Sequence, residues 1–213
     1  MKRYIIGSGG FAKEVYFLLK EVYKNEICFY GFIDVANGKD SIYIGENRYE
    51  VINENTFDDT TDFKTENVEL YFGIASPKLI QKIAQRFERF SFPNLIHGSF
   101  TGLTESIKMG VGNIITPGCI FTADVSIGSF NIFNTCTCLG HDTTIGSYNV
   151  FLPRTQVSGC VKIGDHNVFG MNASIIQGKK IGNNNSFGAY SYIIRSVQDD
   201  NSYFGIPAVK INF

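Results

Sequence analysis

A histidine and an aspartate stand next to each other at positions 141 and 142, in a chain of 213 residues that has only three histidines. A histidine side chain with its ordinary pKa of about 6.5 can accept a proton at neutral pH. A neighbouring carboxylate can orient the imidazole and stabilise its protonated form. The pair therefore suits a reaction in which a nucleophile, such as an amine, loses a proton as it attacks. His141 is the predicted general base, and Asp142 is its predicted helper.

A second candidate site lies near the start of the chain, where Gly7-Ser8-Gly9-Gly10 separates a predicted strand at 4–6 from a predicted amphipathic helix at 11–23. A glycine turn at this place lets backbone amides approach a phosphate at the helix N-terminus. With Phe11-Ala12 the turn fits the dinucleotide pattern G-x-G-x-x-A, and Asp34 follows at about the spacing of that pattern. The predicted ligand-binding residues are Gly7, Ser8, Gly9, Gly10 and Asp34.

The segment that carries this turn is short and holds only one mononucleotide half. Further strands are predicted at 28–33 and 69–74 and a helix at 77–89, which together make a small α/β unit with a parallel sheet. A nucleotide diphosphate is therefore favoured over NAD as the ligand. The alternative is a tight turn without any ligand.

An apolar residue recurs at every sixth position from Leu103 to Ile193 without interruption. A period of eighteen residues is superposed on it, seen in the Ile-Gly pairs that begin at 127, 145, 163 and 181. Six residues per side and three sides per coil predict a triangular parallel β-helix with glycine- or asparagine-rich corners. Each sixth side chain should point inward, and residues eighteen apart should stack about 4.8 Å from each other.

The repeat also tests the first candidate site. His141 lies two residues after an inward position, and the matching residues in later coils are Gly159, Gln177 and Arg195. None of them is a histidine, so no structural ladder explains His141; an exposed polar corner residue is the alternative. Gly159 lies one coil beyond His141 on the same face, where a side chain would obstruct a ligand that runs along the coils. A corner that requires positive φ would explain this glycine equally well.

Composition excludes several classes of function. The formal net charge of -1 gives no sign of a nucleic-acid partner, and no apolar run approaches the length of a membrane span. The N-terminus does not read as a signal peptide, so a cytoplasmic location is expected. The five cysteines include Cys136-Thr137-Cys138 but no Cys-x-x-Cys, and no metal site is predicted.

A glycine-turn α/β unit joined to a hexapeptide β-helix resembles the NeuD/PglD family of sialic-acid and bacillosamine acetyltransferases. The motifs that carry the resemblance span most of the chain: GSGGFAKEV at 7–15, GFID at 31–34, FPNLIHGS at 92–99, GHDTTIG at 140–146, VSGCVKIG at 157–164 and YFGIPAVKI at 203–211. The resemblance implies a left-handed β-helix and a homotrimer. It also implies an activity in glycan biosynthesis, the transfer of an acetyl group from acetyl-CoA to an amino group of a nucleotide-linked sugar. The domains expected are a nucleotide-sugar-binding unit at 1–98, the β-helix at 99–200, and a tail at 201–213 that packs near CoA.

The resemblance also implies roles for individual residues. The histidine that matches His141 is the family's general base and is followed by an acidic residue. Gly159 matches a glycine whose backbone meets the thioester region, and CoA would lie in the cleft between neighbouring β-helices. Other cofactor-binding residues implied in this way are Gly188, Ala189 and Pro207.

One position departs from the family pattern. Many members carry a second histidine nine residues after the first, where this chain has Val150, and Arg154 replaces a usual glycine nearby. A backbone amide would then have to stabilise the oxyanion. The alternatives to N-acetylation are O-acetylation of a sugar such as sialic acid, a non-catalytic nucleotide-sugar-binding protein, which Val150 favours, and an oxidoreductase, which the glycine turn suggests. His97 is expected to be structural and His166 to be a solvated corner residue, and Cys160 is not expected to act as a nucleophile.

Overall fold

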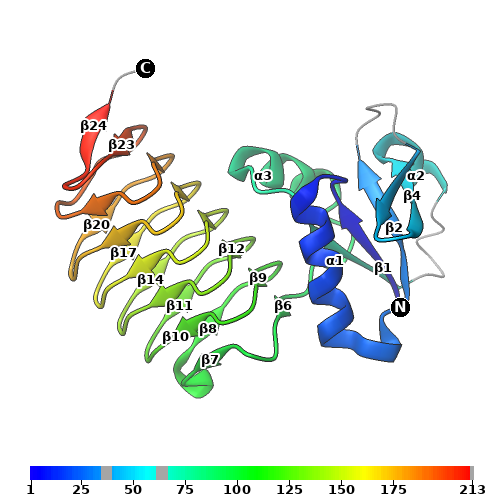
Figure 1. Cartoon of the computed structure of the whole chain (residues 1–213), viewed down its shortest axis with the longest axis horizontal. Coiled ribbons are helices and arrows are strands. Elements are labelled where there is room, and N and C mark those ends of the chain that lie inside the picture. Colours follow the sequence, from blue (N-terminus) through cyan, green and yellow to red (C-terminus); the bar gives the residue numbers. More distant parts are fainter. Residues whose placement is uncertain (35–39, 61–66, 212–213) are drawn as a thin grey trace.

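The computed structural model of the chain describes residues 1–34, 40–60 and 67–211. An α/β unit is followed by a three-sided β-helix, and the C-terminal hairpin closes the far end of that β-helix (Figure 1). None of the helices in the described ranges is long and apolar enough to cross a membrane.

The α/β unit is built on one five-stranded sheet in the order β3-β4-β2-β1-β5. Its strands are β1 (Lys2–Ile6), β2 (Phe29–Asp34), β3 (Ser41–Ile44), β4 (Asn47–Asn53) and β5 (Val68–Phe72). The pairs of β1 with β2 and β5, and of β2 with β4, are parallel, which confirms the predicted unit. The antiparallel hairpin of β3 and β4 was not predicted and makes the sheet mixed.

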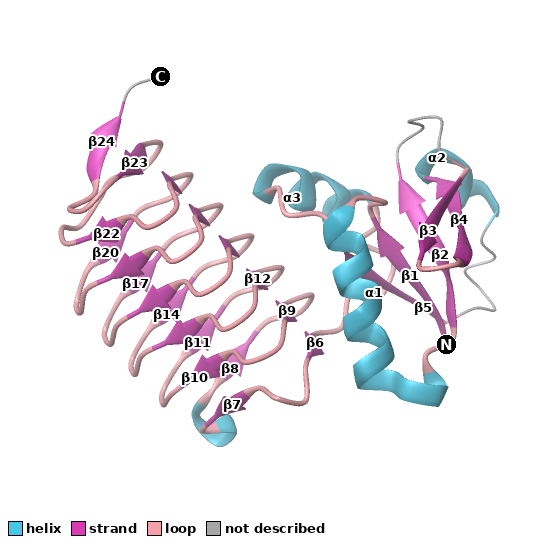
Figure 2. Cartoon of the chain, in the orientation of Figure 1, coloured by secondary structure: helices cyan, strands magenta, loops and turns pink. Residues whose placement is uncertain are grey.

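Three α-helices accompany the sheet: α1 (Gly10–Tyr23), α2 (Glu54–Thr60) and α3 (Pro77–Arg86), and a short 3-10 turn, η1 (Lys24–Glu26), follows α1. The apolar stripe of α1 at Ala12, Val15, Leu18 and Leu19 is buried, as its spacing of three and four residues predicts. Helices α1 and α3 lie between the sheet and the β-helix, whereas α2 is on the far side (Figure 2). One apolar core joins the α/β unit to the outer face of the β-helix.

Three parallel sheets form the β-helix, and each is named here after its first strand. The β6 side holds β6 (Leu95–Ile96), β9 (Ile114–Ile115), β12 (Ile132–Phe133), β15 (Val150–Phe151), β18 (Val168–Phe169), β21 (Ser186–Phe187), β23 (Ser202–Phe204) and the antiparallel β24 (Val209–Ile211). The β7 side holds β7 (Thr101–Gly102), β10 (Ile120–Phe121), β13 (Cys138–Leu139), β16 (Gln156–Val157), β19 (Ser174–Ile175) and β22 (Tyr192–Ile193). After a 3-10 turn, η2 (Thr104–Ser106), the β8 side holds β8 (Lys108–Met109), β11 (Ser126–Ile127), β14 (Thr144–Ile145), β17 (Lys162–Ile163) and β20 (Lys180–Ile181).

The sixth-residue series forms the core of the β-helix, and every member from Ile115 to Ile193 is buried. The rings of Phe133, Phe151 and Phe169 stack with centroids 4.8 Å apart, which is the predicted coil spacing. Of the two earlier members, Met109 is half-buried against this core, whereas Leu103 precedes η2 outside the regular coil and is 46% exposed. The strand pairing continues beyond the predicted boundaries at 99 and 200, since β6 pairs with β9 and β23 pairs with β21. The division into 1–98, 99–200 and 201–213 as separate units stays a prediction.

The corners do contain residues with positive φ, but most of them are not glycine. Residues with φ between 55° and 72° recur at every sixth position from Asp124 to Tyr190; among them, only Gly178 is a glycine. The asparagine column is not at the surface, because Asn113, Asn131, Asn149, Asn167 and Asn185 are buried. Each of these side chains bonds to the next coil, so the column satisfies backbone groups at the turns.

Candidate active site

The residues predicted to catalyse lie on the corner between the β7 side and the β8 side, where β13 ends and β14 begins. Leu139 is held inside the coil, and the chain then turns outward so that both His141 and Asp142 are exposed. Asp142 takes the left-handed conformation at this corner, with φ of 57°. Because Leu139 points inward before the turn, the imidazole of His141 faces outward.

The imidazole and the carboxylate touch directly, with 2.7 Å between His141 Nδ1 and Asp142 Oδ2. In the neutral imidazole one ring nitrogen carries a proton and the other has a free lone pair. A carboxylate at Nδ1 favours the proton on that nitrogen, so the lone pair is at Nε2. The contact thus prepares His141 to accept a proton at Nε2.

Gly159 lies next to this imidazole, one coil further along the same corner. A Cβ atom at Gly159 would lie 2.6 Å from Nε2 and 2.7 Å from Cε1 of His141. The φ of this glycine is not positive, so its lack of a side chain is required by the imidazole and not by the turn. Among the described residues no acceptor takes the amide proton of Gly159. The corner therefore places the lone pair of His141 Nε2 next to the backbone of Gly159.

Cys160 also belongs to this corner, and its amide donates to the carbonyl of His141. The ligand atoms of His141, Asp142 and Cys160 lie within 4.8 Å of one another, but these three exposed groups leave a metal ion otherwise open to solvent. The prediction of no metal stays a prediction. Cys119 is unlike Cys160, because burial raises the pKa of its thiol to about 11.

The glycine turn forms the second site. Gly7 takes a φ of 106°, and a Cβ atom there would lie 2.6 Å from a side-chain carbon of Ile74. Ser8 donates its hydroxyl to the carboxylate of Asp34, which ties the turn to the end of β2. Gly9 caps α1 with no side-chain hydrogen bond, and the Cβ positions of Gly9 and Gly10 face open space. The first amides of α1 are therefore accessible to an anion.

A pocket of about 580 Å³ opens at this turn, lined by Ser8, Gly9, Gly10, Lys13, Ser41, Ile42 and Tyr43. Gly7 and Asp34 do not line it; they hold the turn from behind. Lys13 and Tyr43 were not among the residues predicted from the sequence. Lys13 could have been found as a cation in the first turn of the helix, but Tyr43 reaches the turn only through the unpredicted hairpin.

The residues predicted to bind the cofactor lie in three places. Gly159 is beside His141, whereas Gly188 and Ala189 follow β21 on the corner between the β6 side and the β7 side. That corner faces α1, since Thr116 and Pro117 on it share a pocket with Phe17 and Lys13. Pro207 lies between β23 and β24 at the C-terminal end. Within one chain, Gly188 and Ala189 do not come together with His141.

Val150 and the remaining histidines contribute to packing. Val150 is fully buried between the β6 side and the α/β unit, so a histidine there could not reach an acyl group at His141 of the same chain. His166 stacks on Tyr148 with ring centroids 5.0 Å apart, and its Nε2 lies 3.0 Å from Oε1 of Gln81 in α3. His97 bonds to Ser99 at the entry to the β-helix. Thus His166 is not the solvated corner residue expected from its position but a contact between the two parts of the chain.

The sequence matches no known family model and no curated protein. Solved structures, however, match it over its whole length. PerB from Caulobacter crescentus in complex with CoA and GDP-perosamine has 26% identity and a TM-score of 0.87, and the match covers 100% of this chain and 98% of PerB. The H141N variant of perosamine N-acetyltransferase from the same organism, also with CoA and GDP-perosamine, has 25% identity and a TM-score of 0.89 with the same coverage.

The acetyltransferase domain of PglB from Neisseria gonorrhoeae, in complex with acetyl coenzyme A, shares the fold at 20% identity. Its TM-score is 0.86, and the match covers 99% of this chain and 98% of that domain. Fold and site together define an enzyme of the acyltransferase class, built as the hexapeptide-repeat sugar acetyltransferases are. The predicted resemblance to the NeuD/PglD type and the predicted left-handed β-helix are thereby confirmed.

Proposed function

We propose that the chain is an acetyl-CoA-dependent N-acetyltransferase that acts on the amino group of a nucleotide-linked amino sugar. The observation that carries the proposal is the contact of His141 with Asp142, which leaves Nε2 free beside Gly159. A general base and a hydrogen-bond donor at one point are what acyl transfer to an amine requires. The complex of PerB with CoA and GDP-perosamine supports this class of substrates.

In the proposed reaction the sugar nitrogen attacks the thioester carbonyl carbon, the C–N bond forms and the C–S bond breaks. His141 Nε2 accepts the proton that the amine loses, and the thiolate of CoA leaves and becomes protonated. Asp142 stabilises the imidazolium through its bond to Nδ1. The negative charge on the carbonyl oxygen is met by the Gly159 N–H, which takes the place of the second histidine of the family. No covalent intermediate on Cys160 is needed.

The nucleotide would bind at the glycine turn. Its phosphates would accept hydrogen bonds from the first amides of α1 and from Lys13. The ring of Tyr43 is 57% exposed at the same pocket and would stack on the base. Ser8, Gly9 and Gly10 would contact the ligand, whereas Gly7 and Asp34 would position them.

The reaction would take place between copies of the chain in a homotrimer. Helix α1 faces the first coils of the corner that holds Gly188 and Ala189 further along, whereas His141 is on the other corner of the β7 side. Two copies that meet along their β7 sides would bring one chain's His141 to the partner's nucleotide pocket. CoA would then lie between them, and Pro207 would pack near it. A cytoplasmic location remains expected for the enzyme.

The His141→Ala variant tests the proposal. General-base catalysis supplies about a hundredfold in rate, so the variant should release free thiol from acetyl-CoA at least about a hundredfold more slowly. The assay would use a panel of UDP-, dTDP- and GDP-linked amino sugars. His97→Ala is the matched control and should leave the rate unchanged. Near-wild-type turnover in His141→Ala, with an unchanged thermal midpoint, would contradict the assigned role.

The buried Val150 supports a second candidate, a protein that binds a nucleotide sugar without transferring an acetyl group. Calorimetry separates the two candidates. Binding of a nucleotide sugar together with no detectable binding of acetyl-CoA would favour the second candidate. Replacing the amino sugars of the panel by their hydroxyl counterparts tests for O-acetylation in the same assay.

A further inference from the structure

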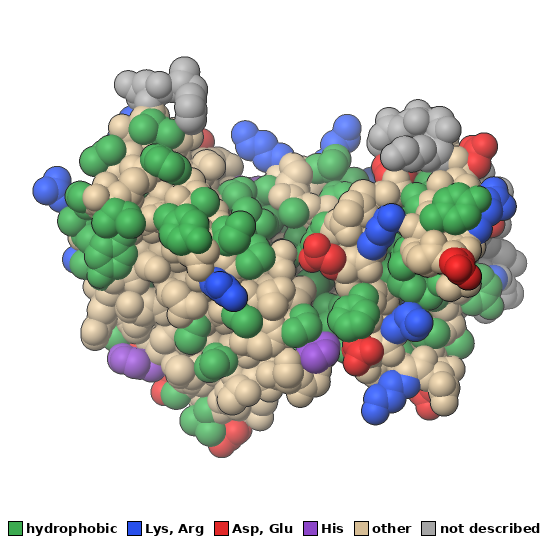
Figure 3. All heavy atoms as spheres, in the orientation of Figure 1, with side chains coloured by type: hydrophobic (Ala, Val, Ile, Leu, Met, Phe, Trp, Pro, Cys, Tyr) green, Lys and Arg blue, Asp and Glu red, His purple; other side chains and the backbone are tan. Residues whose placement is uncertain are grey.

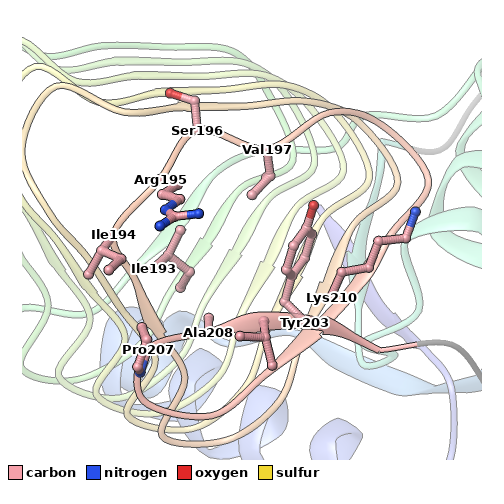
Figure 4. Close-up of a pocket in the computed structure, with 10 residues that line it drawn as sticks. Ile193, Ile194, Arg195, Ser196, Val197, Tyr203, Pro207, Ala208 and Lys210 are labelled. Atoms are coloured by element: carbon pink, nitrogen blue, oxygen red, sulfur yellow. The ribbon is translucent and has the colours of Figure 1, made fainter.

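Two further pockets of the chain differ in the elements that they join. One of about 360 Å³ lies at the last coil, where Figure 4 shows side chains of the loop after β22 and of the C-terminal hairpin around it. The other, of about 530 Å³, is lined by Ala84 and Gln85 of α3 together with Phe130 and Tyr148 of the β-helix. Of these two, only the second joins the α/β unit to the β-helix, and it marks the place where α3 meets the coils.

A column of three stacked rings lies on this corner, between the β8 side and the β6 side. Phe130, Tyr148 and His166 are eighteen residues apart, and each takes the left-handed conformation with φ of 60° or 61°. Their ring planes are within 16° of parallel, and the centroids are 5.4 Å and 5.0 Å apart. The next residue of the series is Asn184. His166 is therefore the last ring of the column, and stacking on Tyr148 fixes the plane of its imidazole.

The edge of the His166 ring contacts α3. Its Nε2 lies 3.0 Å from Oε1 of Gln81, a distance that suits a hydrogen bond donated by Nε2–H. Between residues 1–92 and the coils, this is the one side-chain hydrogen bond found in the part of the chain that the structure describes. The β-helix thus holds α3 by a directional contact in addition to apolar packing.

Helix α3 runs along the ring column. Gln85 lies one turn after Gln81, and it lines the pocket beside Tyr148 and Phe130. Four residues of an α-helix rise about 6 Å, and neighbouring coils are about 4.8 Å apart. The C-terminal half of α3 therefore lies at the earlier rings of the column, and its N-terminal half lies at His166.

The N-terminal end of α3 is connected to the glycine turn through the segment that follows β5. In this segment the amide of Gly73 donates to the carbonyl of Ile6, the residue before the turn. A Cβ atom at Gly7 would lie 2.6 Å from Cγ2 of Ile74, and a Cβ atom at Gly73 would lie 2.6 Å from Cα of Ala12 in α1. The segment is therefore packed tightly against the glycine turn and against α1. Because close-packed interiors transmit displacements, a shift of α3 along its axis would move both.

We infer that His166 and Gln81 are positioning residues for the nucleotide site, because through α3 they hold the glycine turn in place against the β-helix. The inference rests on the proposed function, since it takes a nucleotide to bind at that turn. Neither residue lines the pocket at the turn, so both act through the segment after β5. Without their hydrogen bond, α3 can slide along the ring column, and the first amides of α1 meet the phosphates less well.

Two substitutions remove this hydrogen bond but keep the packing. His166→Phe keeps a ring at the end of the column, and Gln81→Met keeps a side chain of similar size in the helix. Each should raise KM for the best nucleotide sugar of the panel about three- to tenfold, as expected for one lost hydrogen bond, and leave kcat and KM for acetyl-CoA within about twofold. Gln85→Met, at an exposed position one turn later in α3, is the matched control and should change none of the three.

The double variant shows whether the two residues act through one bond. If they do, His166→Phe combined with Gln81→Met should raise KM for the nucleotide sugar no more than either single substitution does. Effects that multiply in the double variant would contradict a shared role. A rise in KM for acetyl-CoA equal to that for the nucleotide sugar would contradict it as well, because a general loss of structure affects both substrates.

Calorimetry with UDP, dTDP and GDP, without turnover, separates this inference from the proposed function. Both single variants should bind the nucleotide that the wild type prefers about three- to tenfold more weakly. If this weakening is found but no amino sugar leads to thiol release, the proposed reaction fails while the positioning role stands. If the variants bind that nucleotide as tightly as the wild type does, or if the wild type binds none of the three, the positioning role is refuted.

Discussion

At the scale of single residues, the site depends on a close fit between His141 and Gly159. The imidazole occupies the space that a side chain at Gly159 would fill, and its Nδ1 is held by Asp142. The absence of one side chain therefore sets where the proposed base stands.

We predict that Gly159→Ala lowers kcat/KM by about 10- to 100-fold, because the new Cβ displaces the imidazole from its position. Steady-state kinetics with acetyl-CoA and the best sugar of the panel would measure the loss. Gly98→Ala is the control, since a Cβ at Gly98 meets no atom within 4 Å and its φ is not positive. Unchanged kinetics in Gly159→Ala would show that the imidazole position does not matter.

At the scale of elements, two-residue strands are too short to hold a sheet by themselves, and ladders of identical side chains connect them. The phenylalanine rings fill the interior, while the buried asparagines bond from coil to coil. The Asn149 side chain donates to Asn131 and to the carbonyl of Gly164, and it accepts from the amide of Asn167. Each coil is thereby tied to both of its neighbours.

We predict that Asn149→Ala lowers the free energy of unfolding by about 3 kcal/mol, because it leaves a buried amide and a buried carbonyl without partners. Urea unfolding at one fixed protein concentration would measure this. Thr144→Ala, on the exposed face of β14 in the same coil, should change the stability little. If the two substitutions cost the same, the asparagine ladder does not stabilise the coils.

At the scale of the whole molecule, the three sides of the β-helix have different outer faces. The β6 side is covered by the chain's own α/β unit, and the β8 side carries Lys108, Lys162 and Lys180. The β7 side exposes Ile120 and Tyr192, and further hydrophobic side chains are exposed over the C-terminal hairpin (Figure 3). The β7 side is the side through which we propose that copies of the chain meet.

We predict a solution mass of three times the chain mass of 23.7 kDa by light scattering. Ile120→Glu places a charge on the β7 side, where Ile120 is 44% exposed, and should yield smaller species with reduced activity. Ser126→Glu adds the same charge on the exposed face of β11 and should leave the mass unchanged. A monomeric wild type would refute the trimer and with it a site shared between copies.

Much of the fold and part of the site were predictable from local sequence alone. The six-residue period specifies which side chains point inward, because the strands of the regular coils have the same length and their corners turn in the same way. It therefore determined the register of the β-helix, and it singled out His141 as a residue that the repeat does not require. The turn at Gly7–Gly10 was equally local, since it joins consecutive elements.

Only the tertiary structure decided what depends on surfaces far apart in the chain. It placed Val150 beneath the α/β unit and brought Tyr43 to the glycine turn. A period states where a residue lies within its own coil but not which face another unit covers. That choice follows from long-range packing of apolar surfaces, which leaves no repeat in the sequence.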